Sequence, residues 1–149
     1  PNGRIKKFAK ASILDNQGMY FSCDVGKQLN KDDGTLALEN YAYDDLFDVG
    51  FGLDKAGRIQ TYESASTHGM ALIGVNITEN GETDKWLLEN SWGPESGYKG
   101  YLTMTDEWFD EYMFRIIIHK KYVDVKTLEI LEQEPVKLPP WDPMFTPEK

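Results

Sequence analysis

A long apolar run followed by a tight-turn signal occupies the middle of this sequence. Gly69–Ile77 is almost continuously apolar. The pair Asn80-Gly81 follows it and is the strongest short-range signal for a β-hairpin. Asp84–Glu89 (DKWLLE) then reads as the returning strand. The chain is therefore expected to contain an antiparallel sheet that includes this hairpin.

The same hairpin predicts which residues lie at its open end. If the turn centres on Asn80-Gly81, residues whose numbers add to about 161 lie opposite each other, and His68 and Asn90 add to 158. The two side chains are therefore expected close together. A register shift of one residue moves a side chain to the other face of a sheet, so the sequence leaves open whether both share one face.

Around the hairpin, the patterns predict short helices and further strands. We expect helices over residues 4–17, 105–112 and 123–131. Strands are expected over residues 19–25 and 101–104, and a buried strand over 114–119. Residues 41–51 and 55–66 are expected to form short helices or irregular segments, and residues 91–100 a loop. Residues 26–40 are polar, and residues 134–149 contain five prolines and are expected to lack regular structure. This order predicts an α+β domain with a curved sheet or partial barrel.

Composition and charge exclude several classes of function. The 149 residues carry 25 acidic and 16 basic side chains, a net charge of −9. This balance argues against nucleic-acid partners and against an anionic membrane surface. No apolar run approaches the roughly 18 residues that a membrane-spanning helix needs. One cysteine and two histidines leave too few ligands for a disulfide framework or a zinc site, so no metal or cofactor is expected.

His68 and Asn90 are the first candidates for chemistry, and each has a plainer alternative. His68 stands at the start of a strand and suits a general acid/base, or it is a hydrogen-bonded histidine at a strand edge. The Asn90 amide oxygen suits an imidazole N–H whose tautomer must be fixed, with Trp92 shielding the bond. The alternative is a turn asparagine beside an anchoring tryptophan.

Cys23 and the Pro-rich end of the chain are the remaining candidates. Cys23 lies in an aromatic strand beside Asp24, with no helix N-terminus to lower its pKa, so a buried structural thiol is predicted over a nucleophile. The segment Trp141-Asp142-Pro143 is either a partner-binding arm or a disordered tail, and the pattern does not choose between them.

Several motifs, in this order, resemble the papain-like cysteine peptidases. The principal motifs are Thr67-His68-Gly69-Met70-Ala71, Glu89-Asn90-Ser91-Trp92-Gly93 and Gly97-Tyr98-Lys99-Gly100-Tyr101. Four supporting segments are similar to the branch of bleomycin hydrolase and bacterial aminopeptidase C: residues 21–27 (FSCDVGK), 104–109 (MTDEWF), 131–135 (LEQEP) and 141–144 (WDPM). The resemblance covers most of the chain.

The resemblance implies a fold and a set of roles. It implies a papain-like fold, with residues 1–133 forming the C-terminal, β-barrel-like lobe with short helices and residues 134–149 forming an extended C-terminal arm. His68 matches the catalytic histidine, Asn90 the asparagine that orients it, and Trp92 the indole that covers their bond. Cys23 matches a structural cysteine.

The departures from this family pattern are as informative as the matches. The nucleophile of the family lies in a Gln-x-Gly-x-Cys-Trp segment upstream of the histidine, and no such segment occurs here. The chain therefore resembles the C-terminal portion of an enzyme whose cysteine-bearing N-terminal lobe lies elsewhere, and alone it is expected to be inactive.

The resemblance also implies an activity for the intact protein. It implies a cytoplasmic, homohexameric aminopeptidase that acts on peptides, with an arm from Leu138 to Lys149 in the active-site cleft and the Lys149 carboxylate meeting the substrate N-terminus. The charged, proline-containing tip departs from the small residues usual in the family, which leaves an endopeptidase variant open. A non-catalytic assembly or binding module that kept the fold is the alternative of a different class.

Overall fold

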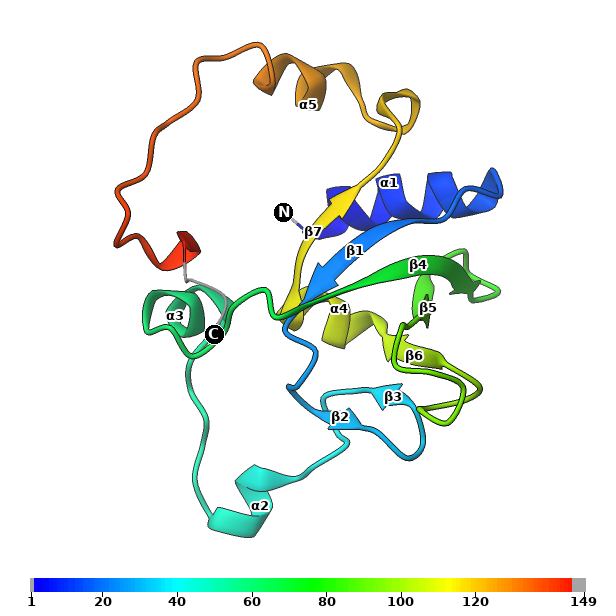
Figure 1. Cartoon of the computed structure of the whole chain (residues 1–149), viewed down its shortest axis with the longest axis vertical. Coiled ribbons are helices and arrows are strands. Elements are labelled where there is room, and N and C mark those ends of the chain that lie inside the picture. Colours follow the sequence, from blue (N-terminus) through cyan, green and yellow to red (C-terminus); the bar gives the residue numbers. More distant parts are fainter. Residues whose placement is uncertain (1, 146–149) are drawn as a thin grey trace.

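A seven-stranded mixed sheet organises the part of the chain that this computed structural model describes, residues 2–145 (Figure 1). The strand order is β2-β3-β6-β5-β4-β1-β7. Its strands are β1 (Met19–Cys23), β2 (Leu29–Asn30), β3 (Thr35–Leu36), β4 (His68–Ile77), β5 (Thr83–Glu89), β6 (Tyr101–Thr105) and β7 (Met113–Ile117). Neighbouring strands are antiparallel except β3 and β6, which are parallel.

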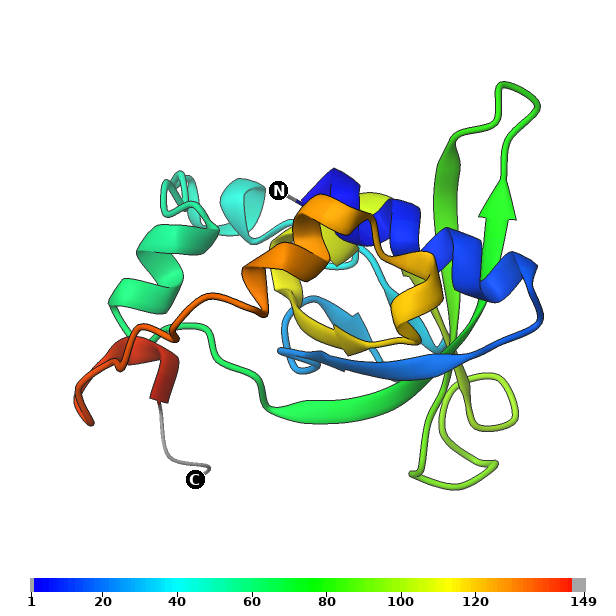
Figure 2. The ribbon, with the colours of Figure 1, turned by 90° about the horizontal axis from the view of Figure 1, so that it is seen from above.

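The helices are short and lie mainly on one side of the sheet. They are α1 (Asn2–Leu14), α2 (Tyr43–Phe47), α3 (Lys55–Gln60), α4 (Asp106–Tyr112) and α5 (Val125–Ile130), with 3-10 turns η1 (Lys120–Tyr122) and η2 (Pro143–Phe145). Figure 2 shows α1, α4 and α5 on the same side of β1 and β4. Thr105 caps α4, since its hydroxyl accepts a hydrogen bond from the Trp108 N–H.

The core lies between the sheet and these helices. Alternate residues of β5 and β6 are buried, as period-2 packing requires. Aromatic rings fill the centre: Phe109 of α4 lies 5.7 Å from Phe21 and 5.1 Å from Trp86 between ring centroids. Both contacts are tilted, the geometry that aromatic pairs favour. Packing of α4 onto β1 and β5 therefore fixes the centre of the domain.

A buried lysine joins α1 to α4 through ion pairs. Lys6 is only 9% exposed, and its ammonium group binds the Asp106 carboxylate and, at 2.7 Å, that of Asp110. The Asp106 carboxylate also accepts hydrogen bonds from Thr83 and Trp86 of β5. Burial raises the pKa of Asp106, but the hydrogen bonds from Lys6, Trp86 and Thr83 outweigh it and lower the pKa overall. These bonds hold the first helix against the sheet.

The predicted hairpin is confirmed, with a turn one residue longer than its sequence signal. The Thr78 N–H donates to the Glu82 carbonyl at 2.8 Å, which closes a three-residue loop over residues 79–81. Gly81 has φ of +83°, the left-handed conformation that such a loop requires and that glycine adopts most easily.

Other expectations are confirmed or corrected. The α+β half-barrel with short helices is confirmed. The strand expected to be buried over residues 114–119 is wrong in that respect: β7 lies at the sheet edge and Ile117 is 65% exposed. Two-residue strands β2 and β3 arise in the segment considered only polar, because two residues carry no periodicity. The proline-rich end, expected to lack regular structure, contains the 3-10 turn η2.

Two further points concern the whole described chain. Within residues 2–145, no helix combines the length and apolarity needed to cross a bilayer. The division into a lobe over residues 1–133 and an arm over 134–149 stays a prediction.

Candidate active site

His68 and Asn90 meet at the open end of the hairpin, so the predicted proximity is confirmed. His68 is the first residue of β4, and Asn90 directly follows β5. The His68 Nε2 and Asn90 Oδ1 atoms are 2.8 Å apart. Since an amide oxygen only accepts, Nε2 carries the proton and donates it to this bond. The Nδ1 atom of neutral His68 is then the ring nitrogen with a free lone pair.

The backbone fixes the orientation of the Asn90 amide. The Ser91 N–H donates to the same Asn90 Oδ1 at 2.8 Å, so the oxygen and not the amide nitrogen must face that side. The Asn90 N–H donates to the Gly100 carbonyl at 2.9 Å, which fixes the main chain where β5 ends. One oxygen thus accepts both bonds, and His68 is held in one tautomer by a neutral partner.

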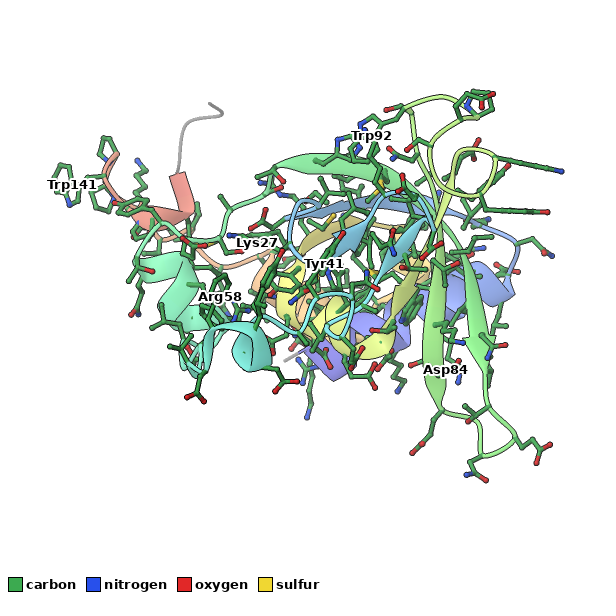
Figure 3. The ribbon with its side chains drawn as sticks, turned by 90° about the horizontal axis from the view of Figure 1, so that it is seen from below. Lys27, Tyr41, Arg58, Asp84, Trp92 and Trp141 are labelled. Atoms are coloured by element: carbon green, nitrogen blue, oxygen red, sulfur yellow. The ribbon has the colours of Figure 1, made fainter. Side chains whose placement is uncertain are left out.

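Trp92 covers this pair. Its ring lies 4.8 Å from the His68 ring, with 29° between the planes, and Figure 3 shows it beside β4. The Lys31 ammonium group, from the β2–β3 turn, lies 5.7 Å from the Trp92 ring centroid. Trp92 remains 39% exposed. The indole therefore shields the histidine from solvent on one side. No sequence pattern had indicated that Lys31 lies near Trp92.

The backbone before His68 is anchored to the end of β1. Cys23 is the ladder partner of His68, and the Thr67 N–H donates to the Cys23 carbonyl at 3.0 Å. The next residue, Asp24, is 5% exposed and accepts a 2.8 Å hydrogen bond from the Ser64 hydroxyl. These bonds determine where the chain enters β4, and an aspartate three residues after Phe21, at the end of an apolar strand, was the signal that could have found them.

Two backbone close approaches shape the surroundings of the site. Gly34 and Gly97 lie so close that a Cβ on Gly34 would be 2.7 Å from the Gly97 Cα, which brings the β2–β3 turn against the loop that carries Trp92. A Cβ on Gly69, directly after His68, would be 2.7 Å from the Tyr20 ring. Glycine at residue 69 therefore lets Tyr20 lie beside the histidine strand.

Two depressions flank Tyr20. One, of about 540 Å³, is shallow and open, and it includes Gly69, Ala71 and Asn90. The other, of about 330 Å³, lies between Ala65 and Ser66, just before His68, and residues 143–144 of η2. The Tyr62 hydroxyl donates to the Trp141 carbonyl at 2.7 Å. The described part of the C-terminal segment therefore returns to the neighbourhood of His68, whereas Lys149 lies outside the described residues.

Cys23 is buried, as predicted. Its exposed fraction is zero. Burial and, to a smaller degree, the adjacent Asp24 carboxylate raise the pKa of the Cys23 thiol well above its usual range. A thiol that stays protonated and away from solvent is a poor nucleophile. Since Cys23 is the only cysteine in the sequence, this chain offers the His68–Asn90 pair no other thiol.

Among residues 2–145, no group of three or more His, Cys, Asp or Glu side chains converges in a way that could hold an ion.

A half-barrel sheet with short helices and a Trp-covered His–Asn pair places the chain in the papain-like fold class. A solved structure supports this class: that of PepW from Lactobacillus rhamnosis superposes with a TM-score of 0.90 at 36% identity, over 95% of this chain and 32% of that one. The model of the Peptidase C1-like family matches residues 1–145. The chain belongs to that family.

Curated relatives carry two recurrent names. Mouse bleomycin hydrolase is 44% identical over 143 residues, which cover 94% of this chain and 31% of the relative. Aminopeptidase C of Lactococcus lactis is 40% identical over 141 residues, which cover 95% of this chain and 32% of the relative. The chain thus spans about a third of the length of these relatives.

Proposed function

We propose that this chain is the histidine-bearing portion of a cysteine-type aminopeptidase of the bleomycin hydrolase and aminopeptidase C type. The observation that carries the proposal is the 2.8 Å bond from His68 Nε2 to Asn90 Oδ1 under the Trp92 ring. Because Nε2 donates to this bond, Nδ1 is the nitrogen that can exchange a proton with a thiol. The thiol belongs to a cysteine in a part of the intact polypeptide outside this chain, so this chain alone does not hydrolyse peptides.

The proposed steps use His68 twice. Its Nδ1 takes the proton of the thiol, and the thiolate attacks the first peptide carbonyl of the substrate. The imidazolium then protonates the leaving amine, which departs as the shortened peptide. In the second half-reaction His68 takes a proton from a water molecule, which attacks the thioester; the N-terminal residue is released and the imidazolium returns the proton to the departing thiolate. Asn90 keeps the ring aligned through both half-reactions, and Trp92 keeps water from their bond.

The same proposal extends to assembly and location. By similarity to its family we place the intact enzyme in the cytoplasm as a homohexamer with the cysteine-bearing lobe as the partner of this one. We also assign residues 134–149 to an arm that ends in the substrate cleft. The position of residues 143–144 beside Ala65 and Ser66 supports this assignment.

The test uses the intact polypeptide as its gene encodes it. Activity is followed with aminoacyl-coumarin substrates that have a free or an acetylated N-terminus. His68→Ala should abolish turnover, whereas His119→Ala, which removes the other and exposed histidine, should leave it unchanged. Turnover by His68→Ala at the wild-type rate would refute the assignment. An inactive wild-type protein would favour the non-catalytic module.

Removal of residues 144–149 tests the arm. An aminopeptidase is expected to lose its preference for a free N-terminus and to accept the acetylated substrate. If the wild type already cleaves acetylated substrates, the endopeptidase variant is correct instead.

A further inference from the structure

An exposed apolar segment consists of α2 and the chain on either side of it, up to the start of α3. Every residue from Tyr41 to Asp54 is exposed, and we call this stretch the 41–54 segment. Half of its residues are large and apolar or aromatic, with exposed fractions from 41% to 71%: Tyr41, Tyr43, Leu46, Phe47, Val49, Phe51 and Leu53. Figure 1 shows α2 at the end of a loop that extends away from the sheet, and Figure 3 labels Tyr41 at its base.

Hydrogen bonds hold both ends of the 41–54 segment although its side chains are uncovered. At its base, Tyr41 N–H donates to the Gln28 side-chain oxygen at 3.0 Å, and the Gln28 amide donates back to the Tyr41 carbonyl at 3.1 Å. At its far end, the Arg58 guanidinium donates to the Leu53 carbonyl at 2.7 Å. Both ends are thus fixed to the domain, which presents the segment as a preformed loop.

Its aromatic rings are also arranged. Tyr43 stacks on Tyr41 with ring centroids 5.6 Å apart and on Phe47 with centroids 6.3 Å apart, each nearly parallel. These stacked rings face water, so together they form an exposed apolar surface.

Helix α2 cannot sustain itself by local interactions. It has five residues, and isolated helices shorter than about 12–15 residues are marginal in water. The residue before it, Ala42, offers no side-chain cap, and none of the α2 residues is buried by the described part of the chain. Order in such a helix requires a surface that covers it.

The exposed apolar area approaches that of one side of a protein interface. With aromatic side chains of roughly 150–250 Å² each, the seven residues expose on the order of 600 Å² of apolar surface. This equals the largest patches of ordinary monomers and approaches the roughly 800 Å² that each partner buries in a stable complex.

Charge narrows the choice of partner. Asp44 and Asp45 lie in the first turn of α2, and Asp48 follows it, so the apolar surface has an acidic border. Two copies of the 41–54 segment placed face to face would bring six carboxylates together, and the whole chain already carries a net charge of −9. The partner is therefore an apolar surface with basic side chains around it and is not the same segment of a second copy.

The length of the relatives points to the source of that surface. The relatives are about three times longer than this chain, which covers 31–32% of them. We propose that the 41–54 segment docks onto the part of the intact polypeptide that lies outside this chain, in an intramolecular contact. This inference rests on the proposed function only for the existence of that longer polypeptide. The contact would hold the two parts of the enzyme together.

Photo-crosslinking in the intact polypeptide tests this contact without using activity. Phe51→p-benzoylphenylalanine keeps an aromatic side chain at a position that is 64% exposed here. Glu79→p-benzoylphenylalanine is the matched control, because the hairpin tip is exposed and bordered by polar and acidic residues. After irradiation at low protein concentration, the products are sized under denaturing conditions and the crosslinked peptides are mapped by mass spectrometry.

Each outcome decides the proposal. The expected result is a product of monomer mass in which residue 51 is linked to a residue outside this chain, with a yield several-fold above that at residue 79. A product of dimer mass would assign the surface to a second copy and overturn the proposal. Equal, background-level yields at both positions would show that the segment stays in solvent and would also overturn it. Failure of the proposed function would instead appear as a lack of turnover with the crosslink intact.

Discussion

Replacement of Asn90 by alanine should slow the intact enzyme by an amount that the site geometry sets. The substitution removes the acceptor 2.8 Å from His68 Nε2 and leaves the Trp92 ring in place above the histidine. When the histidine is an imidazolium, this bond is charge-assisted and contributes about 1.5–3 kcal/mol. If that energy is expressed in the transition state, kcat/KM falls by about 10- to 150-fold. His68→Ala removes the group to which the proposed mechanism assigns the proton transfers and should cost far more.

Steady-state kinetics with the aminoacyl-coumarin substrate measures this loss. We expect it in kcat with KM little changed, because in the proposed mechanism Asn90 acts through the ring and does not contact the substrate. Asn90→Asp is the matched control: it keeps an oxygen for both His68 and the Ser91 N–H and should retain activity within about tenfold of wild type. An Asn90→Ala loss confined to KM, or one as large as that of His68→Ala, would refute the positioning role.

Two further substitutions test what holds the lobe together. Asp106→Asn should destabilise the protein by about 2–3 kcal/mol at pH 7, somewhat less than loss of a fully buried pair, because Lys6 keeps other partners. Since the pKa of Asp106 is lowered in the folded protein, its stabilisation is fully present above the unfolded pKa of about 3.9 and is lost progressively as pH falls toward the folded pKa. Asp106→Asn should therefore cost less in urea unfolding at pH 3 than at pH 7, and an equal cost at both pH values would contradict this. Gly97→Ala places a Cβ 2.5 Å from the Tyr101 carbonyl and should cost about 2–4 kcal/mol in urea unfolding, whereas Gly81→Ala, with a similar positive φ and open space, should cost only about 1 kcal/mol. Equal costs would mean that backbone strain and not the close approach requires Gly97.

The elements with long, regular patterns could be predicted from the sequence, and those held by tertiary contacts could not. Residues 69–77 carry enough consecutive apolar side chains to predict β4, and the Thr105 hydroxyl with an acidic first turn predicts α4. By contrast, β3 exists because Gly34 presents its carbonyl to the Thr103 N–H at 2.8 Å and packs against Gly97. Those partners are more than sixty positions away, so no local pattern reports them.

Prediction of the His68–Asn90 bond also required the face of the sheet on which each side chain lies, and the sequence did not provide it. In the middle of the hairpin, paired residues such as Val75 and Trp86 have numbers that add to 161, and that register would put His68 and Asn90 on opposite faces. Next to the site, Leu72 pairs with Leu88 and the numbers add to 160, because Ile73 is an extra residue that forms a bulge in β4. When the paired numbers add to an even total, even-numbered residues of β4 lie opposite even-numbered residues of the other strand. His68 and Asn90 therefore share a face as diagonal neighbours, and their Nε2 and Oδ1 atoms come within 2.8 Å. Bulges leave no reliable mark in composition or periodicity. The hairpin signal thus predicted that the two residues meet, while one extra isoleucine determines that they can bond.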